Sequence, residues 1–384
     1  MNLDLTEEQK LIQDTARDFA TTELEPVAAD LDRGNDGSFY DNLKKLAELG
    51  FMGLNIKDEY GGTEAGVVAF SVAMTEIARV CAATAVTVSV NNMVNEVIQA
   101  LGSEEQKHRY IQKICSGEYL AGAFALTEPG AGSDPAAMTT TAVKDGNEWV
   151  LNGSKIFITS GSFAGVFVVW AVTDPAARKG KGISLFLVEA GTKGLIIGKK
   201  EDKMGQHGSP TNELLFQDCR IPADALMGKL NDGFRAAVTE LAGGRIGIGS
   251  LALGIGLAAM DKATGYSLER SQFGQKISAF QATQWKIADM YTALEASRLL
   301  LMSAAYKKEQ GRSFAKEASM AKLFASEAAN KACYEAMQIF GGYGYTKDFP
   351  IERFTRDARI TTIYEGTSEI QRLIIAREIL HEFS

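Results

Sequence analysis

The chain has 384 residues, of which 46% are hydrophobic and 23% are charged, and this composition excludes disordered and fibrous proteins. Its 40 Lys and Arg against 48 Asp and Glu give a net charge of -8, which argues against nucleic acid as a partner and against attraction to anionic membranes. At about 100 to 200 residues per domain, the length predicts two or three domains.

The sequence shows little sign of a membrane-spanning segment, a signal peptide or a metal site. We find no run that approaches the roughly 18 to 20 uncharged apolar residues of a membrane-spanning helix, and the N-terminus lacks the basic and apolar regions of a signal peptide. We therefore expect a cytoplasmic protein without membrane insertion. Four separated cysteines and three histidines show no metal-ligand spacing, which predicts reduced thiols and no metal site.

The first third of the chain has the pattern of helices. Thr6 and Gln9 form a possible capping box before apolar residues at helical spacing. Breaks are predicted at Pro26, at residues 35–37 and at Gly61-Gly62, and the apolar segment 68–101 should be deeply buried. These features predict an N-terminal α-helical domain over residues 1–120.

Short runs of β-branched and aromatic residues follow. Residues 138–143 and 148–151, joined by the Asp145-Gly146 turn, give the strongest hairpin signal. Further strands are predicted at 167–172, 183–188 and 213–216. Residues 121–230 therefore read as a middle β domain with a barrel-like or sandwich-like sheet.

After Pro222 the chain returns to long Ala/Leu/Met-rich helices, including 279–308 and 315–340. Residues 231–384 thus form a predicted C-terminal α-helical bundle. Helices, then strands, then helices indicate an α+β multidomain protein, because a doubly wound sheet would alternate the two.

Residues 247–252 fit the GxGxxG/A dinucleotide-binding pattern, but the preceding residues 234–241 are themselves helix-like, whereas the motif needs a strand there. We expect instead that these small residues let a helix pack closely against a neighbour.

Two polar clusters could carry chemistry. Residues 124–134 place hydroxyls and free amides in a Pro/Gly-rich loop after a short strand, which suits either a ligand edge or a plain interdomain turn. In residues 363–369, Thr367 or Ser368 can cap a helix, while Glu365 is either a solvated acid or a base with a raised pKa. Both readings of the second cluster can hold together.

Five separated motifs, in this order and spacing, resemble the acyl-CoA dehydrogenase family. They are AFALTEPGAGSD (123–134), KIFITSG (155–161), ERSQFGQKISAFQ (269–281), MQIFGGYGY (337–345) and RDARITTIYEGTSEIQRL (356–373). The resemblance also includes DEYGG at 58–62 and covers nearly the whole chain. It implies a helical N-terminal domain, a middle β domain, a C-terminal four-helix domain and an FAD cofactor.

The resemblance also implies residue roles for FAD. One group would line the isoalloxazine ring: Phe124, Leu126, Thr127, Phe157, Ile158 and Thr159. Phe157 stands where many relatives have Trp, and core packing is the alternative for it. A second group would hold the pyrophosphate and adenosine, partly across a subunit interface, or complete the cofactor contacts: Ser133, Arg270, Phe273, Gln281, Gln338, Gly341, Gly342, Thr367, Ser368 and Glu369. Because one chain would build only half of such a site, the resemblance implies a homodimer or, as is usual in this family, a homotetramer built as a dimer of dimers.

Glu365 matches the family's catalytic base, which removes the α-proton of an acyl thioester while the β-hydrogen leaves as hydride. Some relatives carry this base at the position of Gly244, which cannot serve here. Ser133, Arg245, Tyr364 and Gly366 resemble positions at the acyl-CoA substrate, and Ala242 replaces an Asp found in many relatives.

The implied reaction is α,β-dehydrogenation of a short-chain, or short branched or cyclic, acyl-CoA to the 2-enoyl-CoA, with an electron-transferring flavoprotein as acceptor. Thr84 stands where glutaryl-CoA-type relatives have Arg, which favours a neutral acyl group. Asn91, Asn92, Asn95 and Glu96 either face outward or pair with the backbone, or they shape a pocket for a short, cyclic or functionalised acyl group. An acyl-CoA oxidase, another α-carbanion chemistry and a non-catalytic acyl-CoA-binding scaffold are the alternatives.

Overall fold

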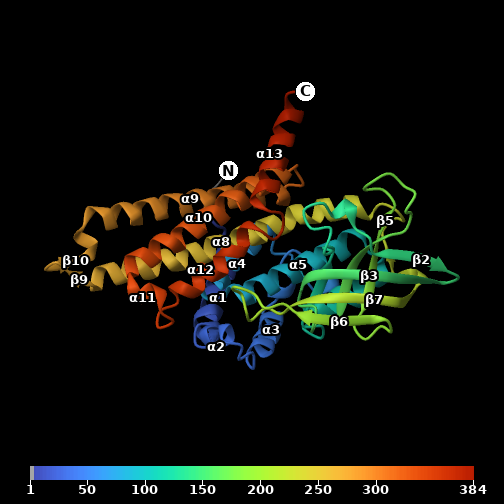
Figure 1. Ribbon diagram of the computed structural model, residues 1–384, viewed down its shortest axis with the longest axis horizontal. Coiled ribbons are helices and arrows are strands. Elements are labelled where there is room, and N and C mark those ends of the chain that lie inside the picture. Colours follow the sequence, from blue (N-terminus) through green and yellow to red (C-terminus); the bar gives the residue numbers. More distant parts are fainter. Residues whose placement is uncertain (1–3) are drawn as a thin grey trace.

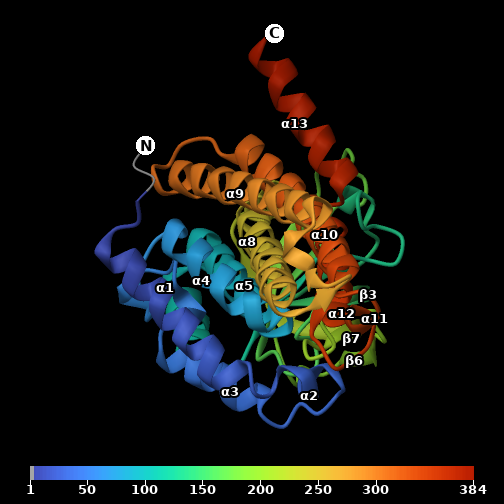
Figure 2. The same cartoon turned by 90° about the vertical axis from the view of Figure 1, so that its left-hand side faces the viewer.

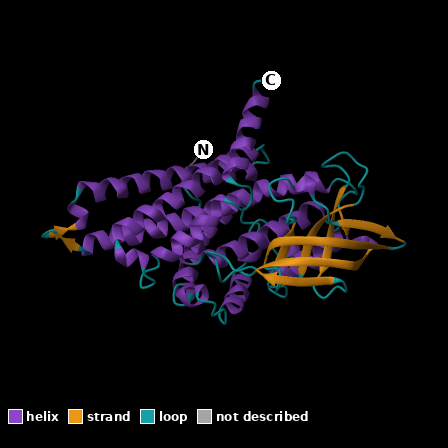
Figure 3. Ribbon diagram, in the orientation of Figure 1, coloured by secondary structure: helices purple, strands orange, loops and turns teal. Residues whose placement is uncertain are grey.

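The computed structural model describes residues 4–384. The N-terminal and C-terminal parts of the chain are helical, and the strands of the main sheet come between them in the sequence. In space, the main sheet lies at one end of the long axis of the molecule (Figure 3). The segregation of helices and strands predicted from the sequence is confirmed.

The N-terminal part is helical, and its first helix begins at the predicted capping box: the Thr6 hydroxyl accepts from Gln9 N, and the Gln9 side chain accepts from Thr6 N. Residues 67–98, most of which are buried, are divided between two helices that meet at Cys81. The helices are α1 (Glu7–Phe19), α2 (Ala28–Asp32), α3 (Phe39–Glu48), α4 (Val67–Val80), α5 (Ala82–Leu101), α6 (Glu104–Gln106) and α7 (Gln112–Cys115), with π-helical turns at Ala20–Leu24 and Lys107–Ile111.

The middle part forms a mixed sheet with strand order β6-β7-β3-β2-β4-β5-β8, and β1 pairs with β4 in parallel. Its strands are β1 (Gly122–Ala125), β2 (Thr141–Asp145), β3 (Glu148–Thr159), β4 (Val166–Val172), β5 (Ile183–Glu189), β6 (Leu195–Lys200), β7 (Thr211–Pro222) and β8 (Leu226–Met227). The predicted hairpin is β2–β3, but its first strand begins at Thr141, since Glu128 takes the amides of Thr139 and Thr140.

Strand β3 is irregular where the sequence predicted flavin contacts. Its pairing with β7 shifts register between Lys155 and Ile158, and Phe157 adopts a left-handed φ of 59° inside this bulge. Bulges re-aim side chains. Phe157 is 61% exposed, so its reading as a core residue is wrong.

The C-terminal part is built around α8 (Gly233–Glu269), which contacts α4, α5, α9 and α10 and runs between them (Figure 2). The remaining helices are α9 (Gln281–Glu309), α10 (Ala315–Phe340), α11 (Gly342–Tyr345), α12 (Ile351–Arg359) and α13 (Ser368–Glu382), and a small hairpin, β9 (Ser271–Gln272) with β10 (Gln275–Lys276), follows α8. The last helix, α13, projects from the body (Figure 1).

The GxGxxG-like segment lies inside α8. A Cβ on Gly247 would come within 2.3 Å of Ser89 Oγ on α5, and one on Gly249 within 2.7 Å of Leu301 on α9 and 3.4 Å of the Lys322 Cα on α10. The glycines therefore permit close helix packing, as the sequence predicted.

The apolar character of one helix was underestimated from the sequence. Residues 241–269 of α8 are long and apolar enough to cross a membrane by length and mean hydropathy, although we expected no such run. However, 89% of the most apolar window is buried inside the protein, as in the core helix of a folded domain.

Candidate active site

Glu365 lies in the turn that leads into α13. Its φ of 54° and the φ of 89° at Gly366 place two successive residues in the left-handed region, which is unfavourable for a glutamate. The Thr367 hydroxyl then accepts a hydrogen bond from Ile370 N and caps α13. The capping and the catalytic readings of this cluster are therefore compatible, because the cap belongs to Thr367 and leaves the carboxylate free.

The Glu365 carboxyl group lies in an unusual environment. Its Oε2 atom is buried and has no hydrogen-bond partner in the described chain. Burial raises the pKa of Glu365 to about 7, against the opposing positive charges of Arg245 on α8 and Lys322 on α10. A carboxyl group with a pKa near neutrality and a free oxygen can accept a proton from a bound ligand at physiological pH.

Gly244 on α8 faces this carboxyl group. A Cβ built on Gly244 would lie 3.0 Å from Glu365 Oε2 and 2.8 Å from the sulfur of Met93 on α5. Position 244 and the Glu365 side chain thus reach the same point in space. This placement agrees with the expectation that a base at either position could serve one site.

The residues expected to line a flavin ring fall into two neighbouring segments. Ile156 N donates to Thr127 O at 2.9 Å, which holds the β3 bulge against the end of β1. Phe124 packs on Trp170 with ring centroids 4.4 Å apart, and Ile158 is buried. Beside the bulge, the buried oxygens Ser160 Oγ and Asn212 Oδ1 have no hydrogen-bond partner in the described chain. The segment thus offers an exposed aromatic ring next to unsatisfied polar atoms.

A fully buried ion pair holds the loop that follows β1, and sequence reasoning missed it. Lys155 and Glu128 are 2.9 Å apart, and their side chains are 0% and 3% exposed. Lys155 also donates to Leu126 O, and Glu128 accepts from the backbone amides of Thr139 and Thr140. The two partners lie in the KIFITSG and AFALTEPGAGSD motifs, so a charged residue in each motif was the sequence feature that could have indicated this pair. Ser133, farther along this loop, is exposed.

Six residues of the second predicted cofactor group lie elsewhere. The β9–β10 hairpin occupies the end of the long axis opposite to the main sheet (Figure 1). There Arg270 lies 5.8 Å from the Tyr343 ring, and Phe273 is 94% exposed. Gln281, Gln338, Gly341 and Gly342 are also exposed. Within one chain, therefore, these residues do not meet the group around Phe124 and Phe157.

The remaining predicted site residues lie on the turn at Glu365, on α13 or on α8. Tyr364 accepts a hydrogen bond from Gln206 Nε2 at 3.2 Å, and Ser368 Oγ is buried without a partner. Glu369 is exposed on the first turn of α13. Arg245 is buried and donates to Ser319 Oγ at 3.4 Å, and Ala242 is buried one turn earlier on α8.

The polar residues of α5 have structural partners. The Asn91 side chain donates to Leu120 O and accepts from Gly122 N. The Asn92 side chain donates to Phe51 O and accepts from Leu54 N. Asn95 donates to Met52 O. The Glu96 carboxylate lies 2.7 Å from Lys308 Nζ. Of the two readings, structural pairing is the one the contacts support.

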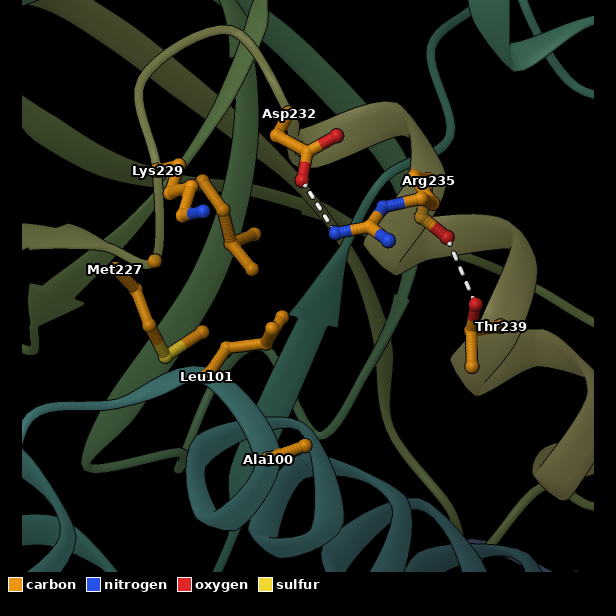
Figure 4. A pocket seen from close by; sticks show the side chains of 10 residues that line it. Ala100, Leu101, Met227, Lys229, Asp232, Arg235 and Thr239 are labelled. Carbon is orange, nitrogen blue, oxygen red and sulfur yellow. Dashed lines mark hydrogen bonds and ion pairs between the residues drawn. The ribbon is translucent and has the colours of Figure 1, made fainter.

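A separate cavity of about 230 Å³ lies between the end of α5, β8 and the start of α8 (Figure 4). Its lining includes Leu101, Met227, Lys229 and Thr239, with Arg235 paired to Asp232 at its rim. Glu365 is not among the lining residues. Across residues 4–384, no group of three His, Cys, Asp or Glu side chains could hold a metal ion.

Three family models match the chain: the N-terminal domain of acyl-CoA dehydrogenase over residues 6–118, the middle domain over 123–219 and the C-terminal domain over 231–380. The chain belongs to the acyl-CoA dehydrogenase family. The fold inferred from the sequence resemblance is that of this family.

Individual relatives cover nearly the whole chain. The short-chain specific acyl-CoA dehydrogenase of Clostridium acetobutylicum is 44% identical, over 99% of this chain and 100% of the relative. The acryloyl-CoA reductase (NADH) of Anaerotignum propionicum is 48% identical, over 99% and 96%. Among solved structures, the butyryl-CoA dehydrogenase of Megasphaera elsdenii has a TM-score of 0.95 at 40% identity, over 99% of this chain and 100% of that one. A chain from a study of the electron transferring flavoprotein of Acidaminococcus fermentans has a TM-score of 0.97 at 45% identity, over 99% and 100%.

Proposed function

We propose that this protein is an FAD-dependent acyl-CoA dehydrogenase that converts a short-chain acyl-CoA thioester to its 2-enoyl-CoA. The observation that carries the proposal is Glu365, whose Oε2 atom is buried without a partner in the described chain and whose pKa is raised to about 7. The names of the short-chain and butyryl-CoA relatives support the substrate class.

The residues fit FAD. The exposed Phe157 ring and the unsatisfied Ser160 and Asn212 oxygens offer a flat ligand both an aromatic contact and polar partners. We assign Phe124, Leu126, Thr127, Ile158 and Thr159 to the same ring. When bound, FAD supplies the acceptor for the hydride that leaves the β-carbon.

The chain's own residues handle the proton. The Glu365 carboxylate removes the α-proton, and a raised pKa makes it a stronger base than an ordinary carboxylate. The developing enolate needs hydrogen-bond donors at the thioester oxygen, and we assign the Glu365 backbone amide to one of them. Tyr364 and Gly366 flank the thioester in this assignment, with Arg245, Ala242 and Ser133 along the rest of the acyl-CoA.

Close packing one turn beyond the carboxyl group supports a short acyl chain. Gly247 follows Gly244 by one turn of α8, and a Cβ there would lie 2.3 Å from Ser89 Oγ and 3.1 Å from the Phe70 ring. Little room therefore remains between α8, α5 and α4 at this level. Thr84, buried on α5, offers no positive charge for an acidic acyl group.

We also propose a homotetramer. The group at Arg270, Phe273, Gln281, Gln338, Gly341 and Gly342 lies too far from Phe157 to meet the same ligand within one chain, so a second chain would complete the site. Helix α13 projects from the body (Figure 2), and Leu380 in its last turn and Phe383 directly after it are 71% and 88% exposed, which suits a subunit contact. Four free, buried cysteines suit a cytoplasmic location.

The test is anaerobic mixing of the holoenzyme with a panel of acyl-CoA thioesters. We expect four-carbon thioesters to bleach the flavin fastest, with electrons passing onward to an electron-transferring flavoprotein. Oxygen consumption without an added acceptor would point instead to an oxidase. A purified protein that takes up no FAD would refute the proposal.

A further inference from the structure

Two wholly buried polar side chains converge on the turn that carries Glu365. Lys322 comes from the N-terminal half of α10, and Gln371 comes from the first turn of α13; both are 0% exposed. Lys322 Nζ donates to Gly366 O at 2.7 Å. Gln371 Nε2 donates to Glu365 O at 3.0 Å and to Gly366 O at 2.8 Å.

The turn needs such support because its backbone is strained. Glu365, with a φ of 54°, is a non-glycine residue in the left-handed region, and Gly366 follows at 89°. Strained conformations of this kind cost about 1 to 3 kcal/mol and persist only where the surroundings fix them. Here three hydrogen bonds hold the two carbonyl groups of the strained residues.

We call Lys322 and Gln371, with their hydrogen bonds to the Glu365-Gly366 turn, the clamp. The clamp is also tightly packed. A Cβ on Gly366 would lie 2.6 Å from Gln371 Nε2, so a side chain at position 366 would displace the Gln371 amide from its hydrogen bonds, and the φ of 89° itself favours glycine. The backbone of Lys322 lies where α8 and α10 approach each other: a Cβ on Gly249 of α8 would come within 3.4 Å of the Lys322 Cα. A buried amine is costly unless it is hydrogen-bonded or paired.

We propose that Lys322 and Gln371 are positioning residues for the base: together they lock the Glu365-Gly366 turn so that the carboxylate points at its ligand. This rests on the proposed function for the role of Glu365, but the clamp itself is a property of the turn. Sequence reasoning missed it, since Lys322 lies 43 positions before Glu365.

The Lys322 amine has a second effect, through its charge. The charged groups that act on Glu365 are Arg245 from α8 and Lys322 from α10, and both lower its pKa against the effect of burial. Tyr364 is adjacent, and burial raises its pKa, so it stays neutral. Removing the Lys322 charge should therefore raise the Glu365 pKa further, and the ionised base should appear at higher pH.

The experiment compares holoenzyme variants in two assays: anaerobic flavin bleaching by butyryl-CoA across pH, and amide hydrogen exchange of residues 363–371. Lys322→Met removes the hydrogen bond and the charge, Lys322→Gln keeps a donor without the charge, and Gln371→Leu removes the other donor. Lys331→Met is the matched control, because Lys331 is an exposed lysine on the same helix.

We expect Lys322→Met and Gln371→Leu to slow bleaching by at least about tenfold, with butyryl-CoA binding and FAD content retained and exchange of 363–371 accelerated. Lys322→Gln should recover part of the rate yet share the shift of the pH profile to higher pH. Lys331→Met should match the wild type.

Unchanged exchange of 363–371 in both Lys322→Met and Gln371→Leu would overturn the clamp. A rate lost only in proportion to lost FAD would also overturn it. If no thioester bleaches the wild type, the proposed function fails, while accelerated exchange confined to the turn would still support the clamp.

Discussion

Replacing Lys155 by Met tests the buried ion pair that holds the ligand loop. The substitution keeps most of the side-chain volume but leaves the Glu128 carboxylate buried, at 3% exposure, without its cation. Burial alone would raise the pKa of Glu128, yet Lys155 and the Thr139 and Thr140 donors together lower it to about 2. Burial lowers the pKa of Lys155 to about 8, so both partners are charged near neutral pH.

Removing one partner of such a pair costs about 3 to 5 kcal/mol, because it leaves an uncompensated buried charge. We therefore expect Lys155→Met to lower the free energy of unfolding by this amount in urea denaturation, followed by intrinsic tryptophan fluorescence, to which Trp149 and Trp170 in the sheet contribute. The variant should also retain less FAD, since Leu126 and Thr127 lie on the segment that Lys155 anchors.

The same loop provides a control. Lys179 pairs with Asp134, but their side chains are 63% and 56% exposed. Exposed pairs contribute at most about 1 kcal/mol, so Lys179→Met should change the unfolding free energy by no more than this. Equal effects of Lys155→Met and Lys179→Met would refute the reasoning that burial makes the first pair costly to break.

Two further predictions concern the base. Because the pKa of Glu365 is about 7 and the ionised form accepts the proton, kcat/KM should fall about tenfold per pH unit below pH 7 and level off above it. A flat profile from pH 5.5 to 8 would count against Glu365 as the base. Because a Cβ on Gly244 would lie 3.0 Å from Glu365 Oε2, a glutamate at position 244 should reach the same ligand. The double variant Glu365→Gly with Gly244→Glu should therefore bleach flavin at least about tenfold faster than Glu365→Gly alone, and equal rates would contradict the shared position.

Local signals predicted much of the fold. The capping box at Thr6 and the extent of α10 follow from short-range chemistry, and both agree with the structure. Strand β6 (Leu195–Lys200) was missed because most of its residues are exposed and its Gly and Lys content resembles a loop. The start of β2 was placed too early, because a distant acid, Glu128, takes the amides that precede it.

Site residues could be predicted from the sequence only where they lie close together in a single motif. Glu365 and its helix cap lie within a few residues of each other, so the sequence could identify them. The ion pair of Lys155 with Glu128 and the contact of Lys322 with Gly366 join residues 27 and 44 positions apart, and only tertiary packing brings them together. The exposure of Phe157 likewise depends on a bulge set by pairing with β7.

The most direct measurement is flavin bleaching by butyryl-CoA in the Glu365→Gln holoenzyme under anaerobic conditions. The amide keeps the size of the side chain but cannot accept the α-proton. We expect the variant to retain FAD and to bind the thioester, while bleaching at least about a hundredfold more slowly than the wild type. Bleaching at the wild-type rate would contradict the assignment of Glu365 as the base.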